Sequence, residues 1–459
     1  MEINHTLIEK YNVPVPRYTS YPPANHFTPA EDPSEYQKII DASNKWDPAH
    51  VALYVHIPFC KKICFYCGCN ACTIKSGNEV TDYVNAIHRE IALLAQHIDS
   101  VRKVTQLHFG GGTPNAIPSS MVTGIVRKLK DTFNFSDDAE IAIETNPAYL
   151  DLTYLDQLLL AGFNRFSFGI QDFNTDVLKL VNREIPAIPV NELIDHVRNQ
   201  NPSAAVNLDF IYGLPGQTPE SFSETIKKAA SLSPDRLVTF SYAHVPWLKK
   251  HQQILEKHGL PGPNEKTEMF LAAYKLLNKR QYEPIGLDHF VKPEDELFKA
   301  QKAQQLHRNF QGYCTRKSSG QVYALGVTGI SQLGRAYLQH TKDLKEYISE
   351  IEKDRIPIDK QMKISPDQFV IREVITQLMC NKEIKWKLLA DLLDLSREEL
   401  LSTIRYDKTA LKHLASDGII EFDGSGIKVT ETGSLFIRNV AASLDPAYEK
   451  EINKYSKSI

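Results

Sequence analysis

Residues 51–72 read VALYVHIPFCKKICFYCGCNAC, and the rest of the chain is interpreted outward from them. The run 51–57 is almost wholly β-branched, aromatic or aliphatic, which is typical of a strand buried on both faces. Cys60, Cys64, Cys67 and Cys69 follow within a few residues. We therefore predict a buried strand whose carboxyl end carries a loop of thiols.

Short β-rich runs alternate with segments of helical period from this strand to about residue 245. Such alternation predicts strand–helix units around a parallel sheet, with each helix packing one apolar face on it. Six units are fewer than the eight of a closed TIM barrel, so we predict an α/β fold with a partial (β/α)6 TIM-like barrel. The predicted strands are 51–57, 104–109, 140–145, 165–170, 206–212 and 237–243.

The remainder of the chain predicts an arm before the barrel and a small domain after it. Runs 282–287 and 322–327 are further strand candidates that would extend the sheet, and the charged stretch 352–360 indicates a linker. Beyond it, helical segments and the sequence IIEFDGSGIKVT, with a turn at Asp423–Gly426, indicate a mostly helical, winged-helix-like module. We expect residues 1–45 to form an amino-terminal arm covering the active site, 46–355 the barrel with its extension, and 356–459 the carboxyl-terminal helical domain.

Charge and hydropathy exclude several classes of protein. The 459 residues carry 53 Lys and Arg against 56 Asp and Glu, and this balance argues against a dominant surface for nucleic acid or anionic membranes. Winged helices often bind DNA, but this module has no basic stripe, so a packing or lid role is favoured. No apolar run approaches the roughly 20 residues that span a bilayer, and residues 1–12 do not resemble a signal peptide. We expect a cytoplasmic protein that binds neither nucleic acid nor membrane.

The cysteines point to metal or redox chemistry. Of seven in the chain, five lie within residues 60–72, and a reducing cytosol disfavours a disulfide framework. A structural zinc site usually needs a second cysteine pair farther along the chain, and none exists here. Three thiolates on a compact loop suit an iron–sulfur cube whose fourth iron stays open. Zinc, a dithiol switch at Cys67 and Cys69, and plainly buried thiols are the weaker interpretations.

Polar residues and glycines follow the other predicted strands. A glycine run, Gly110 to Gly112 with Thr113, comes directly after the second strand, where absent side chains let a ligand approach the backbone. The carboxyl ends of parallel strands share one mouth, so side chains there are expected to converge. Those residues are Glu144 at the end of the third strand, Gln171 after the fourth, Asp209 on the fifth and Ala243 at the end of the sixth.

The sequence resembles a known family. The spacing CxxxCxxC, with Tyr66 just before the third cysteine, resembles the signature of radical S-adenosylmethionine (SAM) enzymes. Further motifs, in collinear order from about residue 7 to 445, resemble the oxygen-independent coproporphyrinogen III dehydrogenases (oxidases) of haem biosynthesis. They are PRYTSYP, YVHIPFC, CGC, HFGGGTP, GIQDFN, VNRE, DFIYGLPGQTPESF, SYAHVP, LDHF and LHRNFQGY.

The resemblance implies cofactors and the residues that hold them. Cys60, Cys64 and Cys67 would hold a [4Fe-4S] cluster and make up the catalytic centre, SAM would chelate the open iron, and Cys69 would not be a ligand. Two SAM molecules are implied, the second near Gln171, Arg183, Asp209 and Ala243. The full set of implied SAM contacts is Tyr54, Tyr66, Gly111, Gly112, Thr113, Glu144, Gln171, Arg183, Asp209, Ala243 and Ile330.

The implied substrate is coproporphyrinogen III, a flexible tetrapyrrole with four propionates. A 5′-deoxyadenosyl radical would abstract hydrogen from a propionate, and loss of CO₂ and an electron would leave a vinyl group. Repetition at a second propionate would give protoporphyrinogen IX. Arg17 is our first candidate for binding a propionate, and Phe310 and Gln311 match residues near the active site. His289 and His307 are expected to be structural. We further expect a monomer that receives its electron from a flavodoxin-like protein.

Three other functions use some of the same residues. A haem chaperone and a haem-opening radical enzyme would share the cluster loop, although the family resemblance implies that the chaperone lacks the PRYTSYP arm and the CGC ending. A zinc-binding regulator would use the winged-helix-like module, but it leaves the glycine run and the strand-end carboxylates unexplained. Departures from the family pattern at Asn115, Asn146 and the second glycine of GVTGIS touch no implied ligand, and Cys72 has no assigned role.

Overall fold

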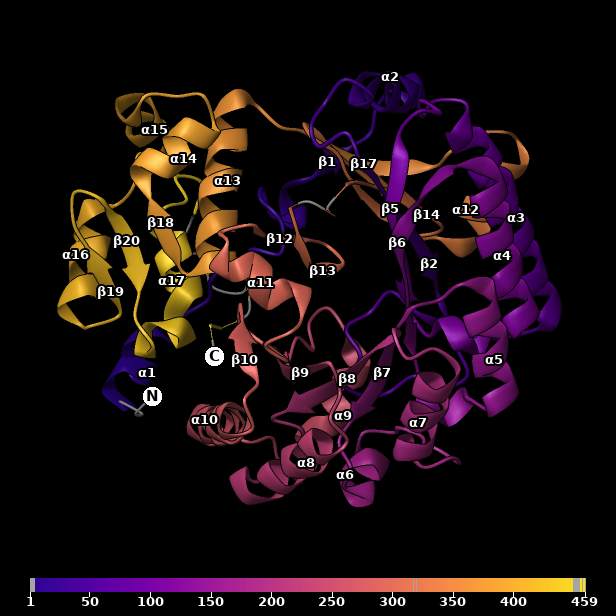
Figure 1. Cartoon of the computed structure of the whole chain (residues 1–459), viewed down its shortest axis with the longest axis horizontal. Helices are drawn as coiled ribbons and strands as arrows, with labels where there is room; N and C mark the ends of the chain where they lie inside the picture. The colour runs from indigo at the N-terminus through magenta and orange to yellow at the C-terminus, as the bar shows by residue number, and fades with distance from the viewer. Residues whose placement is uncertain (1–4, 317, 319, 449–454, 456, 459) are drawn as a thin grey trace.

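A single mixed sheet organises the molecule. The structure is a computed structural model that describes residues 5–316, 318, 320–448, 455, 457 and 458, so the ends of the predicted arm and carboxyl-terminal domain lie outside the described residues. Within these residues the sheet has the order β1-β17-β16-β15-β14-β2-β5-β6-β7-β8-β9-β11-β10 (Figure 1). Its parallel centre comprises β14 (Gln321–Leu325), β2 (Val51–Ile57), β5 (Lys103–Gly111), β6 (Asn134–Thr145), β7 (Arg165–Gln171), β8 (Ala205–Tyr212) and β9 (Arg236–Ser241).

The predicted α/β class and the partial barrel are confirmed. Each of the six predicted strands is present, and β14 adds a parallel neighbour to β2, as expected of run 322–327. One strand end is corrected, because β9 stops at Ser241 and Ala243 follows two residues later in a loop. Tyr242 N donates to Tyr212 O at 2.9 Å, so the chain still follows β8 for one residue before it turns away.

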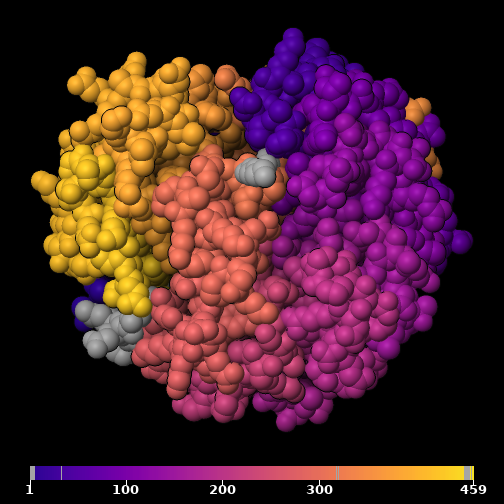
Figure 2. All heavy atoms as spheres, viewed as in Figure 1, coloured from indigo at the N-terminus to yellow at the C-terminus, as the bar shows by residue number. Residues whose placement is uncertain are grey.

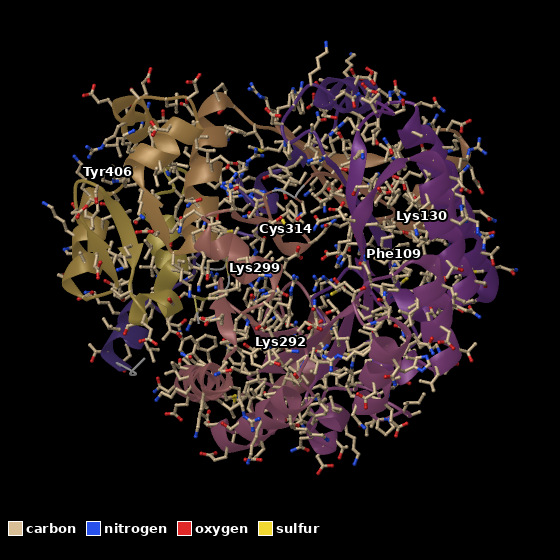
Figure 3. The ribbon with its side chains drawn as sticks, in the orientation of Figure 1. Phe109, Lys130, Lys292, Lys299, Cys314 and Tyr406 are labelled. Carbon is tan, nitrogen blue, oxygen red and sulfur yellow. The ribbon has the colours of Figure 1, made fainter. Side chains whose placement is uncertain are left out.

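Helices return the chain between parallel strands and cover the outer face of the sheet (Figure 1). The first of them buries Val80, Val84, Ile87 and Ile91 at the predicted helical spacing and is capped by Ser76, whose side chain accepts from Glu79 N. On the sheet, Phe109 of β5 is fully buried in the same apolar cluster (Figure 3). These helices are α3 (Gly77–Ala95), α4 (Ser119–Thr132), α5 (Leu152–Ala161), α6 (Thr175–Leu180), α7 (Val190–Gln200) and α8 (Pro219–Ser231).

Antiparallel strands extend both edges of the parallel centre. After β14 come β15 (Ile330–Gln332), β16 (Ala336–His340), β17 (Ile358–Lys363) and β1 (Thr28–Pro29); after β9 come β11 (His289–Val291) and β10 (Glu283–Ile285). The predicted linker at 352–360 is therefore wrong over 358–360. The charged side chains of this segment stay largely outside the core, while its backbone pairs with β16 on one side and β1 on the other.

The connections beyond β9 carry further helices and a hairpin. Among them, the hairpin of β12 and β13 forms a separate two-stranded sheet, and α10 packs beside α8. The elements are α9 (Gln253–Glu256), α10 (Pro263–Lys279), α11 (Glu296–Lys302), β12 (Leu306–Asn309), β13 (Gly312–Thr315) and α12 (Leu344–Glu352).

The carboxyl-terminal part has the predicted winged-helix-like character. The turn at Asp423–Gly426 is confirmed, with Asp423 Oδ1 accepting from Ser425 N at 2.6 Å, and it joins two strands of a three-stranded sheet of order β18-β20-β19. The elements are α13 (Pro366–Asn381), β18 (Glu383–Lys385), α14 (Trp386–Leu392), α15 (Arg397–Ile404), α16 (Lys408–Ser416), β19 (Ile420–Phe422), β20 (Gly426–Val429) and α17 (Ile437–Ala442).

The amino-terminal residues pack on both parts of the molecule. Leu7 and Ile8 of α1 (His5–Tyr11) and the following Val15 lie in the apolar cluster of the carboxyl-terminal helices, whereas Ile39 and Ile40 of α2 (Pro33–Ser43) pack on the barrel. On the face shown in Figure 2, the carboxyl-terminal part lies beside the segment around residue 300, which lies against the barrel. In the described residues, no helix is long and apolar enough to cross a membrane.

Candidate active site

A large cavity opens where the parallel strands end. Its volume is about 840 Å³, within the range of about 300–1,000 Å³ usual for small-molecule sites. Four groups of residues from distant parts of the sequence line it: the arm around Arg17, the cysteine loop, strands β5 to β9 and the β12–β13 hairpin. Polar and charged side chains are frequent among the lining residues, so the cavity suits a ligand that is partly apolar and carries charged groups.

The cysteine loop is closed by a small sheet. Cys60 ends β3 (Phe59–Cys60), which pairs in parallel with β4 (Cys72–Thr73), and Cys72 N donates to Pro58 O at 2.8 Å. The backbone of Cys72 therefore fixes the end of the loop. Cys60 lines the cavity, as do Cys64, Cys67 and Cys69 between the two strands, and Cys60 and Cys64 are buried.

The surroundings of the thiols suit a polynuclear cluster. Burial raises the pKa of Cys60 to about 11, and a hydrogen bond with Thr113, whose Oγ1 lies 3.3 Å from the sulfur, opposes that rise. Arg183 Nη1 lies 3.7 Å from Cys64 Sγ, so a cation is available to balance a thiolate. Among the described residues, no three His, Cys, Asp or Glu side chains gather as they would around a single metal ion. A cube takes each thiolate on a different iron, so thiols spread along one loop fit it.

Glycines brace this loop. Gly112 N donates to Ile57 O at 2.8 Å, and Thr113 N donates to Phe59 O at 2.9 Å. A Cβ on Gly112 would lie 2.7 Å from Pro58 O, and Gly111 has a φ of 120°, which disfavours any other residue. We expected the glycines to let a ligand approach the backbone. The structure adds a second reason, because they let β5 pack directly against the strand that carries Cys60.

A chain of aromatic and acidic side chains lies next to the glycines. His108 Nε2 lies 3.0 Å from Glu144 Oε1, Tyr54 stacks on His108 with ring centroids 6.0 Å apart, and Tyr54 OH lies 3.1 Å from His56 Nδ1. His108 and Glu144 line the cavity. Neither His108, which lines the cavity, nor His56, which does not, was predicted as a site residue, although they stand inside the motifs HFGGGTP and YVHIPFC. His108 stands directly before Phe109 and the motif glycines, and this position is the signal that could have identified it.

Farther around the barrel, Gln171, Arg183 and Asp209 line the cavity together. Gln171 ends β7 with a φ of 70°, and Arg183, which follows α6, donates to Gly169 O of the same strand. Asp209 accepts a hydrogen bond from Ser167 at 2.6 Å, yet burial raises the pKa of Asp209 to about 6. This side of the cavity thus offers one firmly held cation and one carboxyl group that protonates easily.

The remaining predicted residues divide into two groups. Tyr66, Ala243, Arg17, Phe310 and Gln311 line the cavity with those already described, whereas Tyr54 and Ile330 do not. Ile330 instead packs with Phe310 in an apolar cluster around Tyr337. Of the two histidines expected to be structural, His289 lines the cavity with its Nδ1 2.7 Å from Asp288 Oδ1. His307 does not line it, and burial lowers the pKa of His307 to about 4.

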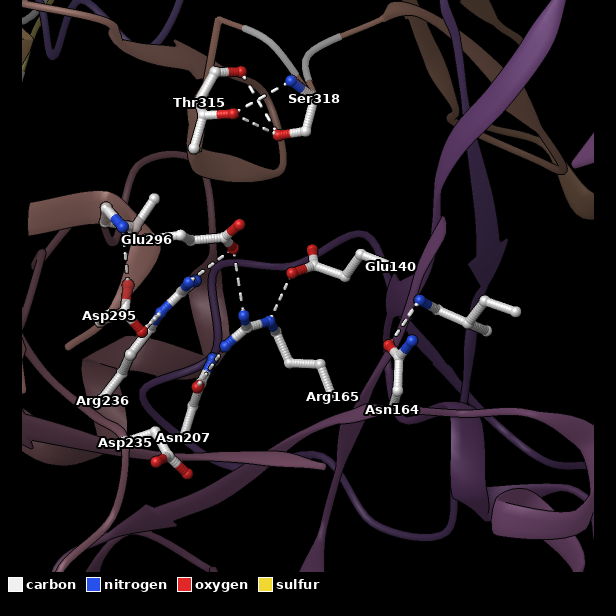
Figure 4. Close-up of polar contacts among 12 residues, drawn as sticks. Glu140, Asn164, Arg165, Asn207, Asp235, Arg236, Asp295, Glu296, Thr315 and Ser318 are labelled. Carbon is white, nitrogen blue, oxygen red and sulfur yellow. Dashed lines mark hydrogen bonds and ion pairs between the residues drawn. The ribbon is translucent and has the colours of Figure 1, made fainter. Parts of the chain in front are cut away.

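An ion-pair network lies near the starts of β7 and β9, and its Arg165 also lines the cavity (Figure 4). Arg165, at the start of β7, contacts Glu140 at 2.5 Å and Glu296 at 3.2 Å. Arg236, at the start of β9, contacts Asp295 at 2.8 Å and the same Glu296 at 3.0 Å. Each arginine therefore has two carboxylates, and the network ties β6, β7 and β9 to α11.

Comparisons with known proteins agree with this geometry. Residues 54–229 match the family model of the radical SAM superfamily, and residues 364–436 match that of the HemN C-terminal domain. The oxygen-independent coproporphyrinogen III oxidase of Synechocystis sp. is 40% identical over 97% of this chain and 95% of its own length. The enzyme of that name from Escherichia coli is 39% identical over 96% of this chain and 94% of its own length. A solved structure of coproporphyrinogen III oxidase (HemN) from Escherichia coli superposes with a TM-score of 0.89 at 36% identity, covering 98% of this chain and all of that one.

The barrel and its cysteine loop thus define a radical SAM enzyme, with a [4Fe-4S] cluster and SAM as its cofactors. Near-full-length identity to the curated relatives then specifies the group within that superfamily. The chain belongs to the family of oxygen-independent coproporphyrinogen III oxidases.

Proposed function

We propose that the protein converts two propionate side chains of coproporphyrinogen III to vinyl groups without oxygen, giving protoporphyrinogen IX. The observation that carries this proposal is one cavity of about 840 Å³ that joins a loop of cavity-lining thiols to arginines from distant parts of the chain. A tetrapyrrole with four carboxylates needs a large pocket with cationic groups on its wall. The family relationship supports the same substrate.

In this proposal Cys60, Cys64 and Cys67 hold the cluster, with Cys64 beside the guanidinium of Arg183. Cys69 is not a ligand. The SAM contacts are proposed to include Tyr66, Thr113, Glu144 and the remaining residues implied by the family resemblance, and those near Gln171, Arg183, Asp209 and Ala243 would take a second SAM molecule. For Tyr54 and Ile330, which do not line the cavity, the proposed contact requires a small rearrangement on binding.

When bound, the cluster and SAM supply a radical that takes hydrogen from the reacting propionate. The chain's own contribution is binding, orientation and exclusion of water. Cys60 and Cys64 are buried, and Tyr66 lies in an apolar group with Val177 and Leu214, so the radical side of the cavity is sheltered. The arm around Arg17 and the β12–β13 hairpin with Phe310 and Gln311 supply the substrate side.

The organisation of the chain supports this division of roles. We propose residues 1–45 as an arm that covers the active site, 46–355 as the catalytic barrel with its extension, and 356–459 as a domain that holds the arm. The protein is further proposed to act as a monomer in the cytoplasm and to take its electron from a flavodoxin-like donor. The near-neutral net charge of −3 is compatible with such a donor docking on a local patch.

An anaerobic assay tests the function. The protein is reconstituted with iron and sulfide and given a reductant, SAM and coproporphyrinogen III, and the tetrapyrrole and nucleoside products are identified. Divinyl product with 5′-deoxyadenosine is the expected result. 5′-Deoxyadenosine without a decarboxylated tetrapyrrole would reject the substrate and favour the haem-opening enzyme, with haem as the next compound. Tight binding of haem without turnover would favour a haem chaperone.

A further inference from the structure

Arg308 is a cavity residue that the family resemblance did not mark. It lies on β12, within LHRNFQGY, and faces the cavity from the hairpin. Its guanidinium carbon stands 4.8 Å from the ring centroid of Tyr313, and Nη1 lies 3.5 Å from Tyr313 OH. Its Nε is buried without a hydrogen-bond partner. In the part of the chain that the structure describes, no carboxylate forms an ion pair with it, so the planar fork is oriented by an aromatic ring and still has unused donors.

Arg17 faces the same cavity from the arm. Its side chain lines that space, and it makes no hydrogen bond or ion pair within residues 5–316, 318, 320–448, 455, 457 and 458. Its two neighbours in the chain, by contrast, are held by hydrogen bonds. Arg438 Nε donates to Pro16 O at 3.0 Å, and Tyr18 OH donates to Asp445 Oδ2 at 3.0 Å. The arm therefore places an unpaired guanidinium at a fixed point of the cavity wall.

The two arginines lie close enough to affect each other. Burial lowers the pKa of Arg17, nearby Asp288 opposes this, and the positive charge of Arg308 lowers the pKa further. Lys266 is a third cation in the neighbourhood, and its pKa falls to about 8 through burial and through the charges of Arg17 and Arg438. Asp288 is the nearby carboxylate, and it is already engaged with His289 at 2.7 Å. Positive charge thus exceeds negative charge at this part of the wall, and a bound anion would balance it.

We propose that Arg17 and Arg308 together bind a carboxylate of the substrate that is not undergoing reaction. The inference rests on the proposed function, since it assigns to one wall of that cavity the recognition of a second propionate while the first reacts at the cysteine loop. Arginine suits this role because its fork binds a carboxylate through two parallel hydrogen bonds. Such an anchor would keep the macrocycle bound after the first vinyl group has formed, so that the second propionate can react before release.

Equilibrium binding of an oxidised porphyrin tests the anchor without turnover. The probe is coproporphyrin III, titrated by fluorescence into the cluster-loaded protein and into the R17Q, R308Q and R308K variants. Loss of a charge-assisted hydrogen bond is expected to weaken binding roughly 10- to 100-fold in the glutamine variants. R308K keeps the charge but loses the fork, so it should fall between wild type and R308Q. The tetramethyl ester of the same porphyrin should bind all four proteins equally.

Arg127 provides the matched control, because it is an exposed arginine on α4, away from the cavity lining. R127Q should bind coproporphyrin III as wild type does. In turnover assays, R308Q should release a larger share of the monovinyl, three-propionate intermediate, with SAM affinity unchanged. Binding by R17Q and R308Q within twofold of R127Q would overturn the anchor. Failure of the wild-type protein to bind coproporphyrin III or to form vinyl product would instead overturn the proposed function.

Discussion

His340 and Glu90 stand face to face in the core, with His340 Nε2 2.8 Å from Glu90 Oε1 and both side chains almost fully buried. The other carboxylate oxygen of Glu90 accepts hydrogen bonds from Gly326 N at 2.8 Å and from Tyr347 OH at 2.5 Å. One carboxylate of α3 therefore joins β16, α12 and the loop that leads to Ile330. Because Tyr83 OH on the same helix donates to His56 O at 2.6 Å, α3 also holds the strand that precedes the cysteine loop.

Removing the carboxylate of Glu90 should destabilise the fold. In Glu90→Ala the buried His340, Gly326 N and Tyr347 OH all lose their partner, so we expect the free energy of unfolding to fall by about 3–5 kcal/mol. Urea denaturation of the apoprotein measures this. The exposed Glu192 of α7 is the control, since Glu192→Ala should change stability by less than about 0.5 kcal/mol. Equal urea midpoints for the two variants would show that Glu90 does not hold these elements together.

Breaking the ion-pair network near the starts of β7 and β9 should also lower the free energy of unfolding. Arg236 and Asp295 are each 6% exposed, and Arg236→Met would leave Asp295 buried and unpaired, which is expected to cost about 3–5 kcal/mol. Lys292→Met removes a cation whose nitrogen lies 3.7 Å from Asp235, with both side chains about one-third exposed, and should cost less than about 1 kcal/mol. Thermal unfolding of the two variants, measured side by side, tests this prediction. A larger loss of stability in Lys292→Met than in Arg236→Met would contradict it.

Gly112 offers a test of the brace on the cysteine loop. A Cβ there would lie 2.7 Å from Pro58 O and 2.9 Å from Phe59 O, and both are backbone atoms that can move only with the loop. Gly112→Ala is therefore expected to lower the iron and sulfide bound after reconstitution to less than about half of wild type. Gly124→Ala is its control, because nothing lies within 4 Å of the new Cβ. That helical alanine should leave cluster content unchanged and raise stability by up to about 1 kcal/mol.

Asp209 gives the apoprotein a pH dependence with a defined sign. Burial raises its pKa from 3.8 to about 6, so between about pH 4 and pH 6 the native state holds a proton that the unfolded state has released. This contribution to stability is complete below about pH 4 and is lost as the pH rises through about 6. The difference in unfolding free energy between Asp209→Asn and wild type should shift in favour of the variant by about 2 kcal/mol from pH 4 to pH 7. A difference that stays constant over this range would exclude a raised pKa at Asp209.

Local sequence patterns were sufficient to predict the parallel strands of the barrel, but not the antiparallel strand β17 beside it. Apolar runs such as 51–57 and 206–212 predicted strands correctly because a strand buried on both faces leaves a strong compositional trace. β17 left none, since it forms by pairing with β16 and β1, two strands that both come earlier in the chain. The site residues divide in the same way. The cysteines could be identified from their spacing in the sequence. That Arg308 lines the cavity without a carboxylate partner could be seen only in the folded structure.

Arg438 and Asp445 bind the arm through hydrogen bonds, and both residues are synthesised long after the arm itself. The bond between Tyr18 and Asp445 joins residues 427 positions apart, so the ribosome has made the whole barrel before the arm can be secured. At roughly 5–20 residues per second, the cysteine loop exists for about twenty seconds or longer before that happens. Until then, the arm lacks this bond, which fixes it beside the cavity that the thiols line.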